Sequence, residues 1–195
     1  MPLVEPLAPD SHRRIPWKNG RGELIVIARE GGESWHDMGV AWHFGRTAIV
    51  EEGPFSDYTG YERLQVVIKG SGLVLVAPDH EIDLRRPMQP RRYDGGMPIR
   101  TRLETGPVDV VNLIADRSRF DIELRVGTAG TEVFCKSGLH IVYSVVGAAE
   151  VEIDGRPSIL PEDHALRVRI ESGTKIRVRI GQVLVGSIRD KPETV

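Results

Sequence analysis

The segment Trp17-Lys18-Asn19-Gly20-Arg21-Gly22 combines residue types that could hold a small ligand. Its tryptophan offers a flat apolar surface, its lysine a cation and its asparagine an amide. Glycine permits left-handed or closely approached backbone, so a ligand could lie against the chain here. The segment therefore predicts a site for a small anionic or carbonyl-bearing molecule. The alternative is a turn before a strand, in which the tryptophan simply packs.

Arg63 is a second candidate, because it follows the Gly/Pro-containing loop 53–60 at the start of an apolar strand. Arginine is the side chain best suited to planar, two-pronged contacts with carboxylates. Phe55 lies in the same loop and is a possible further contact. The alternative interpretation leaves Arg63 exposed and paired with its neighbour Glu62.

Asn112 lies within the apolar run 110–114, so its amide is expected to be buried and to need hydrogen-bond partners. Either nearby backbone satisfies this amide, or the side chain lines a pocket. Arg117 follows closely and could supply another cation to a ligand. Glu23 and His43 are further possible site residues, and Glu23 could act as a base if its side chain points inward.

The residue pattern disfavours a metal centre and nucleophilic catalysis. A metal site in a small barrel needs two histidines alternating on one strand face, with a carboxylate nearby. None of the six histidines forms such a pair, and His140 is expected to be a hydrogen-bonded structural residue. Cys135 ends an apolar strand, which predicts a buried, inert thiol. We therefore expect no metal and no cofactor, and an enzyme less readily than a binding protein.

Composition narrows the class of protein further. The 195 residues carry a formal net charge of -2, which gives no reason to expect a nucleic-acid partner. The arginine pairs at 85–86 and 91–92 are expected to be solvated loop charges. No apolar run approaches membrane-spanning length. The single cysteine and the absence of a basic leader before Pro6 favour the cytoplasm.

Short β-branched runs broken by Gly, Pro and Asp predict an all-β fold. Helical periodicity is weak throughout the chain. The expected strands are residues 24–28, 40–49, 64–69, 73–77, 81–84, 99–103, 108–114, 120–126, 132–134, 140–146, 150–153, 156–160, 165–170, 175–180 and 182–188.

A faint internal repeat suggests two similar halves. The strand, glycine turn, strand, tight turn, strand pattern of residues 64–84 recurs at 141–160, an offset of about 80 residues. Asp154-Gly155 is a strong hairpin signal within the second copy. The repeat predicts a bicupin of two stacked jelly-roll β-barrels. The N-terminal barrel would span residues 1–118 and carry the pocket, with its first strands able to pair with the second barrel, residues 119–195.

Alternation in the last strands predicts which side chains face the core. Val168, Ile170, Ile176, Val178 and Ile180 alternate with Arg167, Arg169, Arg177 and Arg179. Because successive strand residues point to opposite faces, the apolar set is expected inside and the arginines in solvent.

Several motifs in order give the sequence a resemblance to the HutD/Ves family, which is associated with histidine-utilisation operons in bacteria. The matching segments are Pro16-Trp17-Lys18-Asn19-Gly20 with Gly22, Trp42, Gly53-Pro54-Phe55-Ser56, Gly60, Arg63, Gly70-Ser71-Gly72-Leu73, Gly95, Leu103, residues 106–112 and Arg117. The match is good over residues 13–120 and rests on strand pattern alone beyond them. His43 and Arg46 depart from the family pattern, which usually has an arginine and an apolar residue there.

The resemblance implies a two-barrel, cupin-like fold with a small-ligand pocket in the first barrel and a role in regulating histidine breakdown. The ligand would be a small carboxylate such as formylglutamate or urocanate. Arg63 and Arg117 would hold the carboxylate, with Lys18, Asn19 and Asn112 completing the contacts. No established catalytic activity comes with the family. A cupin isomerase or amide hydrolase, and a dimeric interaction scaffold, are the alternative functions, and a homodimer is possible in any case.

Overall fold

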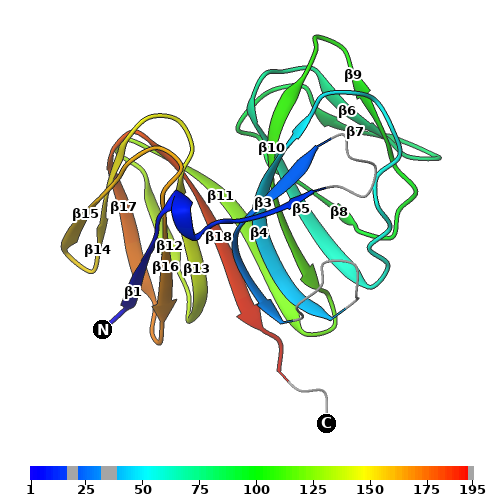
Figure 1. The fold of residues 1–195 in the computed structure, drawn as a ribbon. Coiled ribbons are helices and arrows are strands. Elements are labelled where there is room, and N and C mark those ends of the chain that lie inside the picture. The colour runs from blue at the N-terminus through cyan, green and yellow to red at the C-terminus, as the bar shows by residue number, and fades with distance from the viewer. Residues whose placement is uncertain (17–21, 32–38, 193–195) are drawn as a thin grey trace. The chain divides into compact units, whose positions relative to one another are not determined.

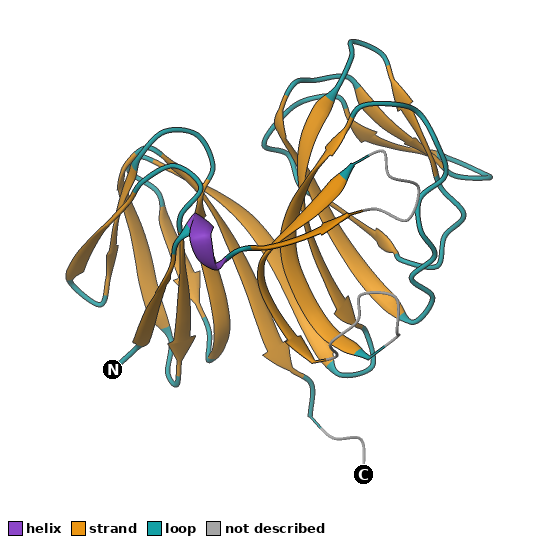
Figure 2. Cartoon of the chain, viewed as in Figure 1, coloured by secondary structure: helices purple, strands orange, loops and turns teal. Residues whose placement is uncertain are grey.

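The structure is a computed structural model that describes residues 1–16, 22–31 and 39–192, and it is built almost wholly of β-strands (Figure 1 and Figure 2). The predicted all-β class is confirmed. Contacts within the chain divide it into two compact units: Met1–His12 with Phe120–Val195, and Arg13–Arg119. Over the described ranges, no helix has the length and apolar character needed to cross a bilayer.

The unit Arg13–Arg119 consists of two antiparallel sheets. The six-stranded sheet has the order β2 (Arg13–Pro16), β3 (Glu23–Gly31), β4 (Val40–Ile49), β10 (Val108–Asp116), β5 (Tyr61–Lys69), β8 (Arg91–Asp94). The three-stranded sheet has the order β7 (Glu81–Leu84), β6 (Leu73–Val76), β9 (Arg100–Leu103). Both sheets are open, so the strand order of this unit does not close a barrel of the kind expected from the sequence.

Apolar side chains from both sheets of this unit form one core. Val67 and Val110 lie opposite each other on β5 and β10. They share a buried cluster with Leu73 and Leu75 of the three-stranded sheet. The face of the six-stranded sheet that carries Val67 and Val110 is therefore its inner face. Residues of β5 and β10 with the same strand parity, including Arg63 and Asn112, lie on that face too.

The second unit also consists of two antiparallel sheets. The five-stranded sheet has the order β1 (Leu3–Leu7), β16 (Ala165–Ile170), β13 (Gly138–Ser144), β18 (Gln182–Asp190), β11 (Phe120–Thr128). The four-stranded sheet has the order β12 (Glu132–Cys135), β17 (Thr174–Ile180), β14 (Ala149–Ile153), β15 (Arg156–Leu160). A short 3₁₀ helix, Pro9–Ser11, follows β1.

The core of this second unit is lined by apolar residues. Its buried cluster draws Val142, Leu166 and Val185 from the five-stranded sheet and Val151 and Ile176 from the four-stranded sheet. Every member of the cluster is apolar, including Cys135. Three buried polar residues, His140, Ser144 and Ser187, also belong to this unit.

The predicted alternation in the last strands is confirmed for Val168, Ile170, Ile176 and Val178, which are buried. It is wrong for Ile180, whose exposed fraction is 59%. The pairing of β14 with β17 shifts here, because Val151 pairs with Val178 whereas Glu150 pairs with Ile180. Such a bulge inserts one residue into the strand and reverses the faces beyond it.

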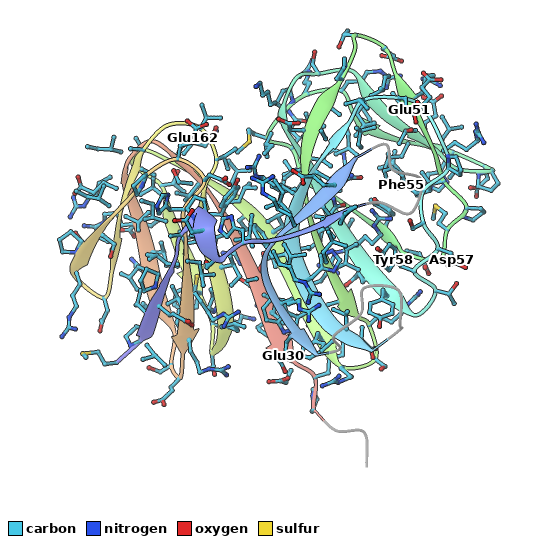
Figure 3. All side chains as sticks on the ribbon, in the orientation of Figure 1. Glu30, Glu51, Phe55, Asp57, Tyr58 and Glu162 are labelled. Carbon is cyan, nitrogen blue, oxygen red and sulfur yellow. The ribbon has the colours of Figure 1, made fainter. Side chains whose placement is uncertain are left out.

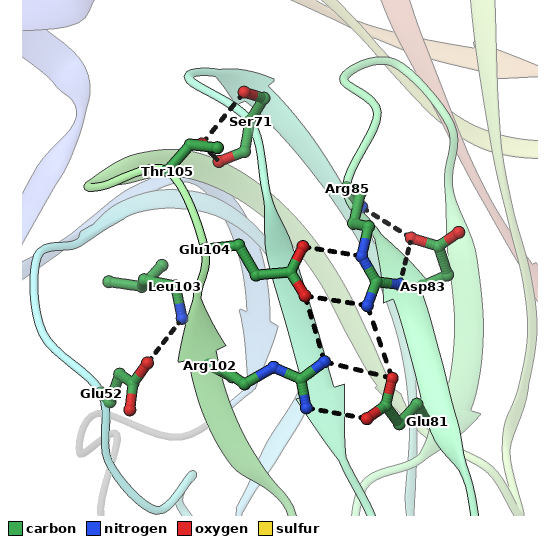
Figure 4. Close-up of polar contacts among 9 residues, drawn as sticks. All are labelled: Glu52, Ser71, Glu81, Asp83, Arg85, Arg102, Leu103, Glu104 and Thr105. Carbon is green, nitrogen blue, oxygen red and sulfur yellow. Dashed lines mark hydrogen bonds and ion pairs between the residues drawn. The ribbon is translucent and has the colours of Figure 1, made fainter.

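Ion pairs cover the outer face of the three-stranded sheet (Figure 4). Arg85 contacts both carboxylate oxygens of Glu104 at 2.8 and 2.9 Å, and Arg102 contacts Glu81 at 2.7 and 3.2 Å. Hydrogen bonds from Arg85 and then from Arg102 lower the pKa of Glu104 to about 2. All four side chains are more than a third exposed, so solvent and salt screen these pairs and each contributes little to stability.

Candidate functional site

Four polar side chains are buried on the inner face of the six-stranded sheet. Arg63, Gln65, Asn112 and His43 have exposed fractions of 6%, 1%, 4% and 2%. Their shared face follows from strand register. Ile114 on β10 lies opposite both Arg63 on β5 and His43 on β4, and Asn112 lies opposite Gln65. We call these four residues, together with Tyr93 on β8 opposite Arg63, the Arg63 cluster.

The guanidinium of Arg63 lies among three aromatic rings. Its Cζ atom is 4.8 Å from the ring centre of Phe55, 5.3 Å from that of Tyr58 and 5.2 Å from that of Tyr93. Figure 3 shows Phe55 and Tyr58 on the segment that leads into β5. Aromatic faces attract a cation, most strongly where water is excluded. The rings thus hold the guanidinium in place and partly offset the cost of removing it from water.

Hydrogen bonds satisfy part of the cluster. Nη2 of Arg63 donates to Oδ1 of Asn112 at 3.3 Å, and the Tyr93 hydroxyl donates to Oε1 of Gln65 at 2.9 Å. Two buried nitrogens, Nε of Arg63 and Nε2 of Gln65, have no hydrogen-bond partner among the described residues. The described part of the chain also places no carboxylate in an ion pair with Arg63. Both spare atoms are donors, so the cluster suits a ligand that accepts hydrogen bonds.

Burial also sets the charge of the neighbouring groups. Desolvation, followed by the positive charges of Arg63 and Arg29, holds the pKa of His43 well below its ordinary value. Desolvation raises the pKa of Tyr93, and the guanidinium of Arg63 partly opposes that rise. His43 and Tyr93 are therefore neutral at pH 7. The cluster carries the positive charge of Arg63 beside a neutral imidazole.

The structure brings together four of the residues predicted from the sequence: Arg63, Asn112, His43 and Phe55. Trp17, Lys18, Asn19 and Gly20 lie outside the described residues. The structure does not bring Arg117 or Glu23 into the cluster. Arg117 is exposed and forms two hydrogen bonds to Asp94, at 2.6 and 2.7 Å. Glu23 is exposed and paired with Arg14 on the neighbouring strand.

Sequence reasoning missed Gln65, Tyr58 and Tyr93. Gln65 could have been found, because it is a polar residue inside an apolar strand with the same parity as Arg63, the kind of signal that singled out Asn112. The alternative of an exposed Arg63 paired with Glu62 is wrong, because Glu62 pairs with Arg92 on the opposite face of β5.

The other sequence candidates for chemistry are structural. His140 is fully buried, with Nδ1 2.8 Å from the Ser187 hydroxyl and Nε2 2.9 Å from the carbonyl oxygen of Lys136. This confirms the expectation of a hydrogen-bonded histidine. Cys135 is also buried, and burial raises the pKa of its thiol to about 11. The prediction of a buried cysteine is therefore confirmed.

A hollow of about 250 Å³ lies elsewhere in the unit Arg13–Arg119, between β3, β4 and β10. Its lining includes Gly22, Glu23, Ile25, Arg46, Thr47 and Asp109. No member of the Arg63 cluster lines it. Within the described ranges, no three His, Cys, Asp or Glu side chains gather where they could hold a metal ion.

Comparison with known proteins gives a consistent relationship. The HutD family model matches residues 9–185. An uncharacterised 21.2 kDa protein from the hutC 3' region of Pseudomonas putida is 26% identical over 156 residues, which cover 80% of this chain and 81% of the relative. The structure of HutD from Pseudomonas fluorescens SBW25 is 28% identical with a TM-score of 0.80, and the match covers 97% of this chain and all of that one.

Two further solved structures share the fold at lower identity. A conserved protein of unknown function from Pseudomonas aeruginosa PAO1 has a TM-score of 0.85 at 22% identity, covering 95% of this chain and 98% of that one. A salicylate 1,2-dioxygenase from Pseudoaminobacter salicylatoxidans has a TM-score of 0.56 at 11% identity, covering 88% and 81%. These likenesses concern the fold alone.

Proposed function

The chain belongs to the HutD family, and from this premise we propose that it is a binding protein that takes a small carboxylate at Arg63. The family is associated with the histidine-utilisation locus, since the relative from Pseudomonas putida is encoded in the hutC 3' region. Candidate ligands are acids formed in histidine breakdown, such as formylglutamate or urocanate. Occupancy of the site would then report the level of such an acid and regulate histidine utilisation.

The observation that carries this proposal is a buried cation without a buried anion. Arg63 is 6% exposed and has no ion-pair partner among the described residues. Burying an unpaired charge costs several kcal/mol, which cation–π contacts of about 0.5–2 kcal/mol each offset only in part. A bound carboxylate would supply the missing negative charge, and its oxygens would accept from the spare N–H groups of the cluster.

The enzymatic alternative gains no support from Glu23, the candidate base, because its carboxylate is exposed and paired with Arg14.

We further propose that the two units together form a bicupin in the cytoplasm. Each unit consists of two antiparallel sheets around its own apolar cluster, and the sequence repeat at 64–84 and 141–160 lies one copy in each unit. In this proposal the unit Arg13–Arg119 carries the ligand site.

Thermal unfolding in the presence of candidate acids tests the proposed function. Formylglutamate, urocanate, acetate and formate would be titrated as sodium salts, with sodium chloride at equal ionic strength as the control. A specific ligand at 100 times its Kd adds about 2.7 kcal/mol to the free energy of unfolding. The proposal would be contradicted if none of the acids raised the melting temperature more than sodium chloride does.

A further inference from the structure

Resting on the proposed carboxylate site, we infer that Gln65 is a second ligand-contacting residue, and that one carboxylate group is held between Nε of Arg63 and Nε2 of Gln65. Gln65 was not among the residues expected from the sequence. Its side chain is 1% exposed, so an unpartnered amide there is costly. The two spare nitrogens belong to residues two apart on one strand face, about 6.7 Å along β5.

The orientation of the Gln65 amide is fixed by its neighbours. The Tyr93 hydroxyl donates to Oε1 of Gln65 at 2.9 Å, so the amide oxygen of Gln65 faces Tyr93. This leaves the amide NH₂ of Gln65 as the end without a partner. Tyr93 is therefore a positioning residue, which acts on the ligand through Gln65.

Asn112 fixes the other anchor in the same way. Its Oδ1 accepts from Nη2 of Arg63 at 3.3 Å, and the three aromatic rings restrict the guanidinium further. The spare Nε of Arg63 is thereby held on the face that Gln65 shares. Two fixed donors and no acceptor between them select an anionic acceptor over a group that carries N–H.

These two donors should bind a carboxylate more tightly than the matching carboxamide. Each carboxylate oxygen would accept from one anchor, Nε of Arg63 or Nε2 of Gln65. An amide would turn its NH₂ toward one of the two donors, which leaves buried N–H groups facing each other. The same geometry predicts the effect of a built-in anion. A glutamate at position 65 would place its carboxylate beside Arg63 and occupy the position proposed for the ligand.

The experiment compares wild type, Gln65→Met and Gln65→Glu by melting temperature and by calorimetric titration with acetate, acetamide and sodium chloride. Wild type should bind acetate at least tenfold more tightly than acetamide. Gln65→Met should lose about tenfold in acetate affinity. Its melting temperature without ligand combines two opposing changes, removal of the unpartnered Nε2 donor and loss of the acceptor of the Tyr93 hydroxyl, so the acetate affinity is the readout for this variant. Gln65→Glu should melt higher without ligand and lose its response to acetate.

The outcomes separate this inference from the proposed function. Acetate binding of equal strength in wild type and Gln65→Met would overturn the role of Gln65 and leave the Arg63 site standing. If wild type itself shows no acetate response beyond that of chloride, the carboxylate site is wrong, and the inference falls with it. Should Gln65→Glu fail to fold, the acetate affinities of Gln65→Met and wild type decide the question. Tyr93→Phe should also lower the acetate affinity, by less than Gln65→Met does.

Discussion

Arg63 and Asn112 contact each other across adjacent strands, with Nη2 of the arginine donating to Oδ1 of the asparagine at 3.3 Å. The two positions are diagonal neighbours, because Arg63 lies opposite Ile114 and Asn112 lies opposite Gln65. Replacing Asn112 by Leu should leave a buried guanidinium N–H without its acceptor and cost about 1–3 kcal/mol of unfolding free energy. Urea unfolding measures this loss. An unchanged midpoint would show that the contact has no energetic weight.

Arg63→Lys and Arg63→Met separate the charge of this residue from its shape. Lysine keeps the positive charge but loses the planar fork, so it should weaken carboxylate binding at least tenfold. Methionine removes the charge and should abolish binding while keeping the ligand-free protein at least as stable as the lysine variant, since no unpaired cation is then buried. Calorimetric titration with acetate and thermal unfolding give the two readouts. Full affinity in either variant would contradict an arginine-centred site.

His43 should make stability depend on pH. Its pKa is lowered in the folded state by burial and by Arg63 and Arg29, so the unfolded chain binds more protons below about pH 6.5. Stability from this group is complete above that pH. As the pH decreases from about 6.5 toward the lowered pKa, the stabilisation from His43 decreases by at most about 1.4 kcal/mol per pH unit. Buried His140 contributes in the same direction.

The measurement for His43 compares wild type with His43→Gln. Unfolding free energies at pH 5 and pH 7.5 should differ less in the variant, because the His140 contribution is common to both proteins. In wild type, NMR signals of the His43 ring should show no titration near pH 6.5. A ring that titrates at its ordinary pKa would mean that the imidazole is solvated.

Cys135 should resist thiol reagents in the folded protein. Burial raises its pKa to about 11, so only roughly one molecule in a thousand would carry the thiolate at pH 8, and the sulfur is shielded as well. Reaction with a disulfide reagent should be slow in buffer and rapid in guanidinium. Fast labelling of the native protein would place the cysteine at the surface.

The bulge in β17 predicts opposite outcomes for two isoleucines of one strand. Ile176→Ala should cost about 2–5 kcal/mol, since the side chain is fully buried in the apolar cluster. Ile180→Ala should change stability by less than about 0.5 kcal/mol, since that side chain is 59% exposed. Chemical denaturation of both variants checks the reversal of faces. Equal losses would favour uninterrupted alternation.

Sequence patterns were sufficient for the central strands and for five edge strands, and they missed the edge strands β1, β2 and β8. The apolar runs that became β5, β10 and β16 satisfy strand periodicity by themselves. By contrast, β1, β2 and β8 lie at sheet edges and were not expected as strands. Two of them contain proline, and β8 carries the pair Arg91-Arg92 that was interpreted as loop charge. Pairing with strands distant in sequence, rather than local preference, makes these segments extended.

The site was predictable in its residue types and not in its environment. Asn112 stood out because a polar residue inside an apolar strand needs partners. Arg63 stood out because it follows a Gly/Pro-containing loop at the start of an apolar strand and because arginine suits carboxylates. The burial of Arg63 depends on Phe55, Tyr58 and Tyr93, which the fold assembles from separate segments. Arg117 and Glu23 had suitable chemistry, but each found an oppositely charged neighbour on an exposed surface instead.

The pairing of β1 with β16 joins Leu3 to Arg169, residues from opposite ends of the chain. A contact so remote in sequence pays a large loop-closure entropy and tends to form late in folding. Until it forms, one edge of β16 stays bare, and a bare edge is a template for association with other chains. Shortened proteins that begin at residue 13 would keep every described residue of the Arg63 cluster and yet gain a tendency to aggregate. The protection of this sheet edge and the proposed ligand site thus depend on different parts of the polypeptide.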